Sequence, residues 1–178
     1  MRGLTFTRTS NIDTVWHVLV EIYAEVWEAR MHEIHYSAER YGERLARHAS
    51  EPGWEVLLGY DGREVAGYVY GSTVRSDSRW WSRMSPSPAP QYIDVPSFAF
   101  KEGMLRPRWR SLGLARWGHD QLLATRPEKQ SVLLVNPRAN SGKIMRRYED
   151  WGYRKIGMQQ PAPDGPILTA MIRSVNRD

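Results

Sequence analysis

The sequence contains no cysteine in its 178 residues. Disulfide bonds, zinc–thiolate clusters and a thiol nucleophile are therefore excluded. The sequence also lacks any run of about eighteen apolar residues, and residues 1–8 lack the apolar core of a secretory leader. We therefore expect a soluble, cytoplasmic protein with no membrane partner.

The composition is that of a globular chain, with 41% hydrophobic and 25% charged residues. A chain of this length buries a core without disulfides or a structural metal, and no metal is expected. No internal repeat and no linker divides the sequence. We therefore expect a single domain over residues 1–178.

The net charge of +5 is unevenly distributed. Residues 101–160 contain 13 Lys and Arg against 5 Asp and Glu, whereas the rest of the chain is slightly acidic. Such a local field concentrates a polyanionic ligand and speeds its arrival. A phosphorylated coenzyme and a nucleic acid would both satisfy it, so charge alone does not choose between them.

Apolar periodicity and turn residues predict an α/β fold with a mixed central sheet of about seven strands and about four helices. The surest local prediction is a hairpin around Asp61-Gly62. Asp13 is expected to cap the first helix and Ser37 to open the second. Residues 75–90 show no period and are expected to form a long loop. The expected strands are 4–8, 54–60, 64–73, 96–105, 131–135, 153–158 and 167–174, and the expected helices 13–27, 37–48, 114–125 and 141–150.

The most informative segment runs from Arg110 to Ala115 and reads Arg-x-x-Gly-x-Ala. It lies between an expected strand and an expected helix. Gly113 and Ala115 allow a ligand to approach the backbone closely, and the free N–H groups of a helix start point at such a ligand. The pattern therefore predicts an anion cradle suited to a pyrophosphate.

This segment resembles motif A of the GCN5-related N-acetyltransferases, the GNAT superfamily, in which Gln/Arg-x-x-Gly-x-Gly/Ala binds the pyrophosphate of acetyl-CoA. Leu105-Arg106-Pro107 resembles the Val-x-Pro that precedes it. Downstream, the strand ending at Val135, then Asn140, and a helix with Tyr148 before Gly152-Tyr153 resemble motif B. The combination is similar to actinobacterial members of the superfamily.

Two departures from the family pattern occur. Gly103 stands where a larger apolar residue is usual, and Asn140 lies one residue farther from Tyr148 than usual. The second departure weakens the expectation that Asn140 contacts the pantetheine arm.

The resemblance implies a single GNAT-like domain that uses acetyl-CoA as co-substrate to acetylate a primary amine. It also implies which residues bind the coenzyme, the pantetheine arm being held by a strand that opens beside Leu105. The expected coenzyme-binding residues are Met104, Leu105, Arg110, Ser111, Leu112, Gly113, Leu114, Ala115, Arg116 and Asn140.

The same resemblance implies direct attack of the amine on the thioester. Tyr148 would protonate the departing thiolate as a general acid, and Glu102 would accept the ammonium proton, directly or through water. Two structural alternatives stay open at this stage. Tyr148 would then pack in the core beside Trp151, and Glu102 would be a solvated or ion-paired residue of its strand.

For the acceptor, the sequence points to aromatic residues near the expected mouth of the site, namely Trp27, Trp80 and Trp81. Arginines in residues 75–83 would repel a polycation, whereas Glu21, Glu25 and Glu28 could attract a single ammonium. These features predict a bulky, partly apolar amine, such as that of a peptide or a natural product.

Three alternatives remain. The donor could be another short acyl-CoA, or the domain could sense acyl-CoA without catalysis. A basic domain could instead bind single-stranded nucleic acid, but the strands show no interleaved aromatic signature, so nucleic acid is disfavoured.

Asn140-Ser141-Gly142-Lys143 fails as a phosphate-binding P-loop, because Pro137 replaces its first glycine. Whether the protein forms a homodimer stays open.

Overall fold

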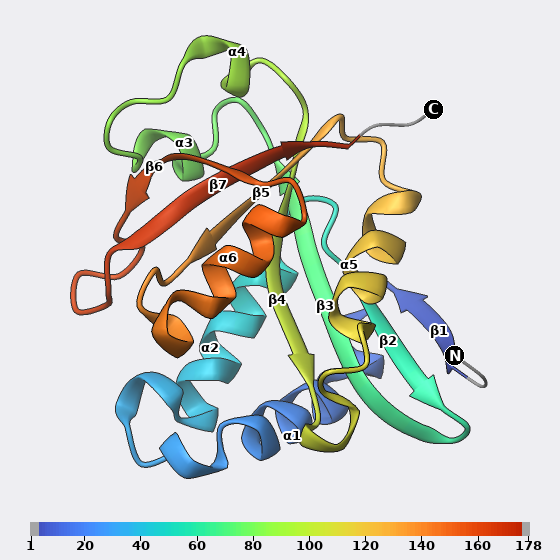
Figure 1. The fold of residues 1–178 in the computed structure, drawn as a ribbon. Helices are drawn as coiled ribbons and strands as arrows, with labels where there is room; N and C mark the ends of the chain where they lie inside the picture. Colours follow the sequence, from blue (N-terminus) through green and yellow to red (C-terminus); the bar gives the residue numbers. More distant parts are fainter. Residues whose placement is uncertain (1–3, 176–178) are drawn as a thin grey trace. The chain divides into compact units, whose positions relative to one another are not determined.

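Seven strands form a mixed sheet in the order β1-β2-β3-β4-β5-β7-β6 in the computed structural model, which describes residues 4–175 (Figure 1). The predicted α/β class and its seven strands are confirmed. The strands are β1 Leu4–Thr9, β2 Glu55–Asp61, β3 Glu64–Val74, β4 Ser97–Leu105, β5 Gln130–Val135, β6 Arg154–Gln159 and β7 Leu168–Ser174. The helices are α1 Trp16–Val26, α2 Ala38–Ala49, α3 Arg79–Ser82, α4 Pro90–Ile93, α5 Leu114–Ala124 and α6 Lys143–Asp150.

The chain divides into two compact units. The first takes residues up to Ser72 together with Lys101–Thr125, and the second takes Thr73–Phe100 together with residues from Arg126 onward. Strands β3 and β4 each contribute residues to both units.

In the first unit, β1, β2 and β3 pair as antiparallel neighbours. The predicted hairpin turn lies at Asp61-Gly62, where Gly62 has a φ of +63°. Helices α1 and α2 cover one face of these strands and α5 covers the other (Figure 1). The core beneath α1 and α2 is built largely from buried Leu19, Ile22, Tyr23, Tyr41, Leu45, Val56, Leu58, Tyr68 and Tyr70.

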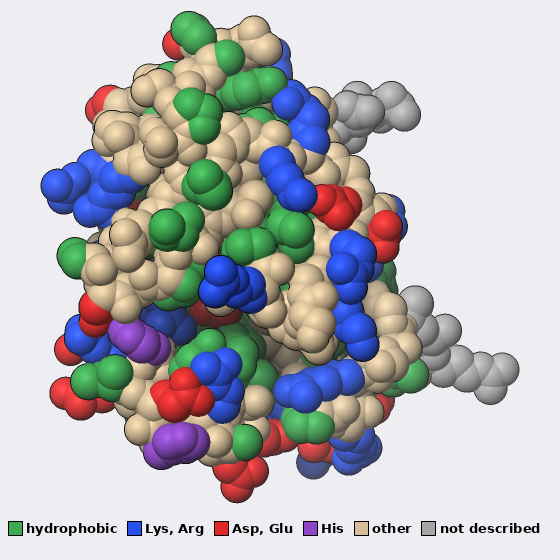
Figure 2. All heavy atoms as spheres, turned by 60° about the vertical axis from the view of Figure 1, so that its left-hand side comes forward, with side chains coloured by type: hydrophobic (Ala, Val, Ile, Leu, Met, Phe, Trp, Pro, Cys, Tyr) green, Lys and Arg blue, Asp and Glu red, His purple; other side chains and the backbone are tan. Residues whose placement is uncertain are grey.

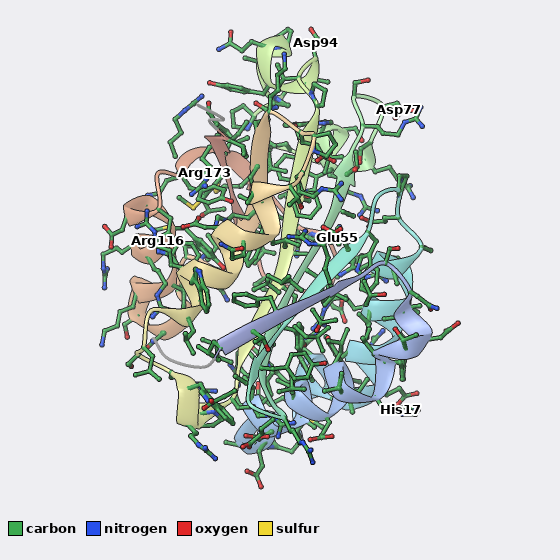
Figure 3. All side chains as sticks on the ribbon, turned by 90° about the vertical axis from the view of Figure 1, so that its right-hand side faces the viewer. His17, Glu55, Asp77, Asp94, Arg116 and Arg173 are labelled. Atoms are coloured by element: carbon green, nitrogen blue, oxygen red, sulfur yellow. The ribbon has the colours of Figure 1, made fainter. Side chains whose placement is uncertain are left out.

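The α5 face is fixed by one arginine on β1. The Arg8 guanidinium pairs with the Glu55 carboxylate and donates hydrogen bonds to the Gln121 carbonyl (2.7 Å) and the Leu122 carbonyl (3.3 Å). These carbonyls lie near the C-terminal end of α5, where a cation is favoured. Figure 3 looks onto this face and labels Glu55. One side chain thus connects β1, β2 and α5.

In the second unit, β5 runs parallel to β4, from Ser97 beside Gln130 to Phe100 beside Leu133. Strand β7 is antiparallel to β5, and β6 is antiparallel to β7. The Ser131 hydroxyl and the Tyr153 hydroxyl are 2.6 Å apart in the buried interior. All four long helices were predicted within a few residues of their observed bounds.

Two local predictions were wrong. Residues 75–90 are not wholly irregular, because the Ser78 hydroxyl accepts a hydrogen bond from the Trp80 N–H and starts helix α3. Such a four-residue helix is too short to show a period. The first helix is not capped by Asp13, since the Asn11 side chain caps a short 3-10 turn and α1 begins only at Trp16.

Gly67 on β3 lies against the end of β4, and this contact generates a prediction. An added Cβ would stand 2.2 Å from the Met104 carbonyl oxygen and 2.8 Å from a Leu105 methyl carbon. We expect Gly67→Ala to destabilise the protein by about 1–3 kcal/mol, because backbone must move to admit the methyl group. Chemical denaturation measures the change.

The matched control is Gly118→Ala in helix α5, where the nearest atom is a Val69 methyl carbon at an ordinary 3.6 Å. There alanine should be tolerated or should stabilise by up to about 1 kcal/mol, because it favours a helix interior. Equal denaturation midpoints for Gly67→Ala and the unaltered protein would show that β3 and β4 do not lie as close together at Gly67 as the structure has them.

Candidate active site

The predicted anion cradle follows directly from β4. After Leu105 the chain makes a 3-10 turn at Pro107–Trp109 and then adopts left-handed backbone at Ser111 (φ +65°) and Gly113 (φ +76°) before α5 begins at Leu114. Gly113 adopts this conformation readily because it has no Cβ, whereas residues with side chains disfavour it. Ser111 does carry a side chain, and positive φ in a non-glycine residue is uncommon. The backbone that leads into α5 is therefore locally strained.

The strand–cradle connection is held on the β2–β3 hairpin by three contacts. The Arg106 N–H donates to the Ala66 carbonyl (3.0 Å), and the Arg108 guanidinium lies 3.2 Å from the Glu64 carboxylate. The buried Trp109 donates its indole N–H to Asp61 (3.2 Å). The cradle is therefore positioned by the sheet rather than by its own sequence alone.

The N-terminus of α5 forms the last part of the predicted cradle. Gly113 is its N-cap and supplies no side-chain acceptor for the first N–H groups. These groups have no intrahelical partner, and together with the helix dipole they favour an anion. Ala115 is half-buried, and exposed Arg116 lies 3.5 Å from Asp120. Figure 3 shows Arg116 on α5.

Arg110 is also at this turn, exposed to solvent. Its Nε donates a long hydrogen bond to the Leu105 carbonyl (3.3 Å), which keeps the guanidinium beside the cradle. Leu112 is 57% exposed, whereas Leu114 and Met104 are buried in the two cores that flank β4. The predicted coenzyme residues Met104 to Arg116 thus lie in one continuous stretch of the first unit.

Glu102 lies on β4 in the same unit. Its carboxylate is 3.6 Å from the Arg44 guanidinium of α2, and its side chain is 19% exposed. Burial raises the pKa of the Glu102 carboxyl, and the Arg44 charge opposes part of that rise. A carboxylate with a raised pKa is a stronger base than one in water.

A layer of four tyrosines around Glu102 was not predicted from the sequence. The Tyr23 and Tyr41 rings stack 3.9 Å apart, and the Tyr41 and Tyr68 hydroxyls are 2.6 Å apart. Tyr70 stacks on Tyr68. Burial raises the pKa of all four hydroxyls, so they stay neutral at physiological pH.

His48 closes one side of this layer, its Nδ1 lying 3.1 Å from the Tyr70 hydroxyl. Burial and the nearby charges of Lys101 and Arg44 lower the pKa of His48 to about 2, so the ring is neutral. The sequence did contain a signal for the layer. Tyr68 and Tyr70 lie two positions apart on β3 and so share a face. Tyr41, Arg44 and His48 recur at helical spacing on α2.

Tyr148 lies on α6 in the second unit and is half-buried. Its ring meets Phe100, Trp151 and Tyr153 edge-on, with centroid distances of 6.2, 5.4 and 5.9 Å. This packing fixes the ring and leaves both predicted roles, general acid and core residue, open.

The loop before α6 absorbs the additional residue between Asn140 and Tyr148. Asn140, Ser141 and Gly142 all have left-handed backbone, with φ of +48°, +53° and +78°. This turn shifts the start of α6 to Lys143, two residues later than predicted. Ser111, Asn140 and Ser141 are the three non-glycine residues with positive φ in the part of the chain that the structure describes. All three lie in the segments that resemble motifs A and B.

The three predicted acceptor tryptophans differ in their surroundings. Trp27 follows α1, is half-buried, and packs against Tyr36 at a centroid distance of 4.6 Å. Trp81 is only 3% exposed and packs in the core of the second unit, whereas its edge-on neighbour Trp80 is half-buried. The buried Trp81 ring therefore holds the Trp80 ring from its core side.

The segment around Trp80 also presents apolar surface. Pro86, Ala89 and Pro90 are exposed between α3 and the start of α4. Figure 2 shows hydrophobic side chains at the surface in its upper part, at the height of α3 and α4 in Figure 1.

Two acidic residues predicted to attract an ammonium are already paired. Arg106 donates to Glu21 (2.5 Å) and to Glu25 (2.6 Å), with its own side chain only 16% exposed. The pairing joins α1 to the end of β4, and the single guanidinium charge offsets one of the two carboxylate charges. Glu28 remains exposed on the turn after α1.

Among residues 4–175, no group of three or more His, Asp or Glu side chains is placed to hold a metal ion. Within the same residues, no helix has the length and apolar character needed to cross a membrane.

The comparisons with known proteins bear on the fold. No protein-family model and no curated protein sequence matches the chain. Among solved structures, the chain is similar to a GNAT-family acetyltransferase from Staphylococcus aureus, with 13% identity, a TM-score of 0.63, and coverage of 97% of this chain and 100% of the other. The ribosomal-protein-S18-alanine N-acetyltransferase from Escherichia coli gives 14% identity, a TM-score of 0.62, and coverage of 98% and 96%.

A third similar structure is the PaiA N-acetyltransferase from Thermoplasma acidophilum, determined in complex with coenzyme A. It shares 13% identity at a TM-score of 0.55, covering 96% of this chain and 99% of the other. At such identities the likeness establishes the fold and not the chemistry. The chain has the fold of GNAT-family acetyltransferases.

Proposed function

We propose that this protein is an N-acetyltransferase that transfers the acetyl group of acetyl-CoA to a primary amine by direct attack. The observation that carries the proposal is the turn with positive φ at Ser111 and Gly113, which leaves the α5 N-terminus without a side-chain cap, on a fold that acetyltransferases share. One protein with this fold is known in complex with coenzyme A.

The coenzyme pyrophosphate would be held by backbone N–H groups from Ser111 to Ala115, with charge added by Arg110 and Arg116. Met104 and Leu105 would line the pantetheine arm. Asn140 would contact that arm as well, and its left-handed backbone supports the assignment, because such strain concentrates at binding sites.

In the reaction, the acceptor ammonium first gives one proton to Glu102. The neutral amine nitrogen then forms a bond to the thioester carbonyl carbon, and the carbon–sulfur bond breaks. Tyr148 donates its hydroxyl proton to the leaving thiolate and regains a proton from the acetylated nitrogen through solvent. The products are the amide and the free thiol of coenzyme A, and Glu102 releases its proton to solvent.

The acceptor class that fits the surface is a primary amine attached to an apolar group. One similar structure is that of an enzyme named as a ribosomal-protein-S18-alanine N-acetyltransferase. By analogy, we propose a peptide amine as the acceptor of this protein. Trp80 would contact the apolar part, because its half-buried ring is fixed from below by Trp81. Trp27 would contribute a second aromatic wall.

The cradle can be tested with Ala115→Asp. Aspartate in the first turn of a helix is compatible with its dipole, so α5 should still form. The added carboxylate would repel the pyrophosphate, and we expect acetyl-CoA affinity, measured by calorimetry, to fall at least about 100-fold, or about 2.7 kcal/mol.

The control for this experiment is Ala124→Asp, the same change at the exposed C-terminal end of α5. It should cost up to about 1 kcal/mol of stability and leave acetyl-CoA affinity unchanged. Unchanged affinity in a folded Ala115→Asp variant would show that the coenzyme binds elsewhere.

The general acid can be tested with Tyr148→Phe, which keeps the packed ring and removes the hydroxyl. We expect kcat to fall by roughly 100-fold with little change in acetyl-CoA affinity, as for the loss of a general acid. Tyr153→Phe is the control in the same aromatic cluster. It breaks the buried bond to Ser131 and should lower stability by about 1 kcal/mol with kcat retained. Equal turnover by Tyr148→Phe and the unaltered enzyme would assign Tyr148 to the core.

The acceptor contact can be tested with Trp80→Ala. For an apolar peptide amine we expect kcat/KM to fall about tenfold, because a large aromatic contact is lost, while acetyl-CoA affinity holds. Trp80→Phe, which keeps a ring, should recover most of the loss. If Trp80→Ala processes the peptide amine as well as the unaltered enzyme does, the acceptor does not contact this segment.

A further inference from the structure

Arg44 on α2 occupies an unusual position in the first unit. Its guanidinium lies 3.6 Å from the Glu102 carboxylate, and it also covers the rings of Tyr23 (5.6 Å to the centroid) and Tyr41 (5.2 Å). An arginine held over aromatic faces has few alternative rotamers. The charge opposite Glu102 is therefore fixed in place by two helices.

The other groups that face Glu102 carry no charge at physiological pH. They come from α1, α2 and β3, and burial keeps each hydroxyl protonated: Tyr23, Tyr41, Tyr68 and Tyr70. His48 at the edge of the layer is neutral. Lys101, next to Glu102 on β4, is 2.8 Å from the Glu51 carboxylate, which engages its charge. Arg44 thus supplies the positive charge that acts on Glu102.

The distance between the two groups matters for chemistry. At 3.6 Å the guanidinium and the carboxylate attract each other without a close bidentate hydrogen bond, which would need about 2.7–2.9 Å. The carboxylate oxygens therefore keep lone pairs that can accept a proton.

We propose that Arg44 is a positioning residue that keeps Glu102 ionised and oriented so that it can take the proton of the acceptor ammonium. This inference rests on the proposed function. In the step, an N–H bond of the ammonium breaks, an O–H bond forms on Glu102, and the amine lone pair becomes free to attack. Arg44 acts through Glu102, the carboxylate that it faces.

The sign of the expected effect follows from charge. Removing the Arg44 cation leaves Glu102 with the full cost of burial, so its pKa should rise further. A higher pH is then needed to ionise it. The acidic limb of the kcat/KM profile for one fixed amine should move to higher pH in Arg44→Met, by about one pH unit or more.

The experiment compares Arg44→Met, Arg44→Lys and the control Arg40→Met in the full chain. Lysine keeps the charge and should return the acidic limb most of the way. Arg40 lies one turn earlier on α2 in an exposed pair with Glu43, and its replacement should leave the profile unchanged. Should Arg44→Met not fold, Arg44→Gln takes its place, since it removes the charge and keeps a polar group.

A second readout does not depend on turnover. Carbon-13 labelling of glutamate carboxyls follows the titration of Glu102 by NMR, with Glu102→Gln used to assign the signal. We expect its midpoint to rise in Arg44→Met and to stay in place in Arg40→Met. An unmoved Glu102 midpoint, or an active Arg44→Met variant with an unmoved acidic limb, would overturn the inference. Absence of any thioester cleavage by the unaltered protein would instead overturn the proposed function, and the NMR titration would still decide whether Arg44 controls Glu102.

Discussion

The close approach of β3 to the end of β4 at Gly67 positions Glu102 and the cradle in the first unit. Gly67 has no side chain, so the backbone of Met104 and Leu105 can lie directly against it. The Arg106 N–H then bonds to the Ala66 carbonyl and fixes where β4 ends. Because side chains alternate along a strand, Glu102 and Met104 share the face covered by α1 and α2. The next residues turn away to form the cradle.

Backbone strain is concentrated in the two segments that resemble coenzyme-binding motifs. Left-handed backbone in a non-glycine residue costs of order 1 kcal/mol or more and persists only where the surroundings impose it. At Ser111 the surroundings are the buried Trp109 on one side and the start of α5 on the other. At Asn140 and Ser141 they are the end of β5 and the start of α6. This distribution supports the proposed coenzyme site.

The sequence predicted those features that depend on neighbouring residues. The hairpin at Asp61-Gly62 and the helix opened by Ser37 follow from local turn and cap chemistry, and both are confirmed. The cradle was located for the same reason, since a strand, a glycine and a helix start are adjacent in the chain. The roles of its residues stay predictions.

Features that join distant residues could not be predicted. The pairing of Arg44 with Glu102 spans 58 positions, and no periodicity reports it. Arg106 likewise pairs with Glu21 and Glu25, which the sequence alone left available to attract an ammonium. Such contacts are decided by tertiary packing, which brings the helices of the first unit onto its strands.

The most direct measurement of the central claim is a coupled assay of the purified protein with acetyl-CoA and a panel of primary amines. The panel should contain apolar peptide amines, small aliphatic amines and polycationic aminosugars. Free thiol and acetylated product are quantified in the same reactions. The account predicts that thiol is released in equal amount to an acetylated amine, with the apolar peptide amines preferred. Folded protein that releases no thiol with any amine, or releases thiol without an acetylated product, would contradict it.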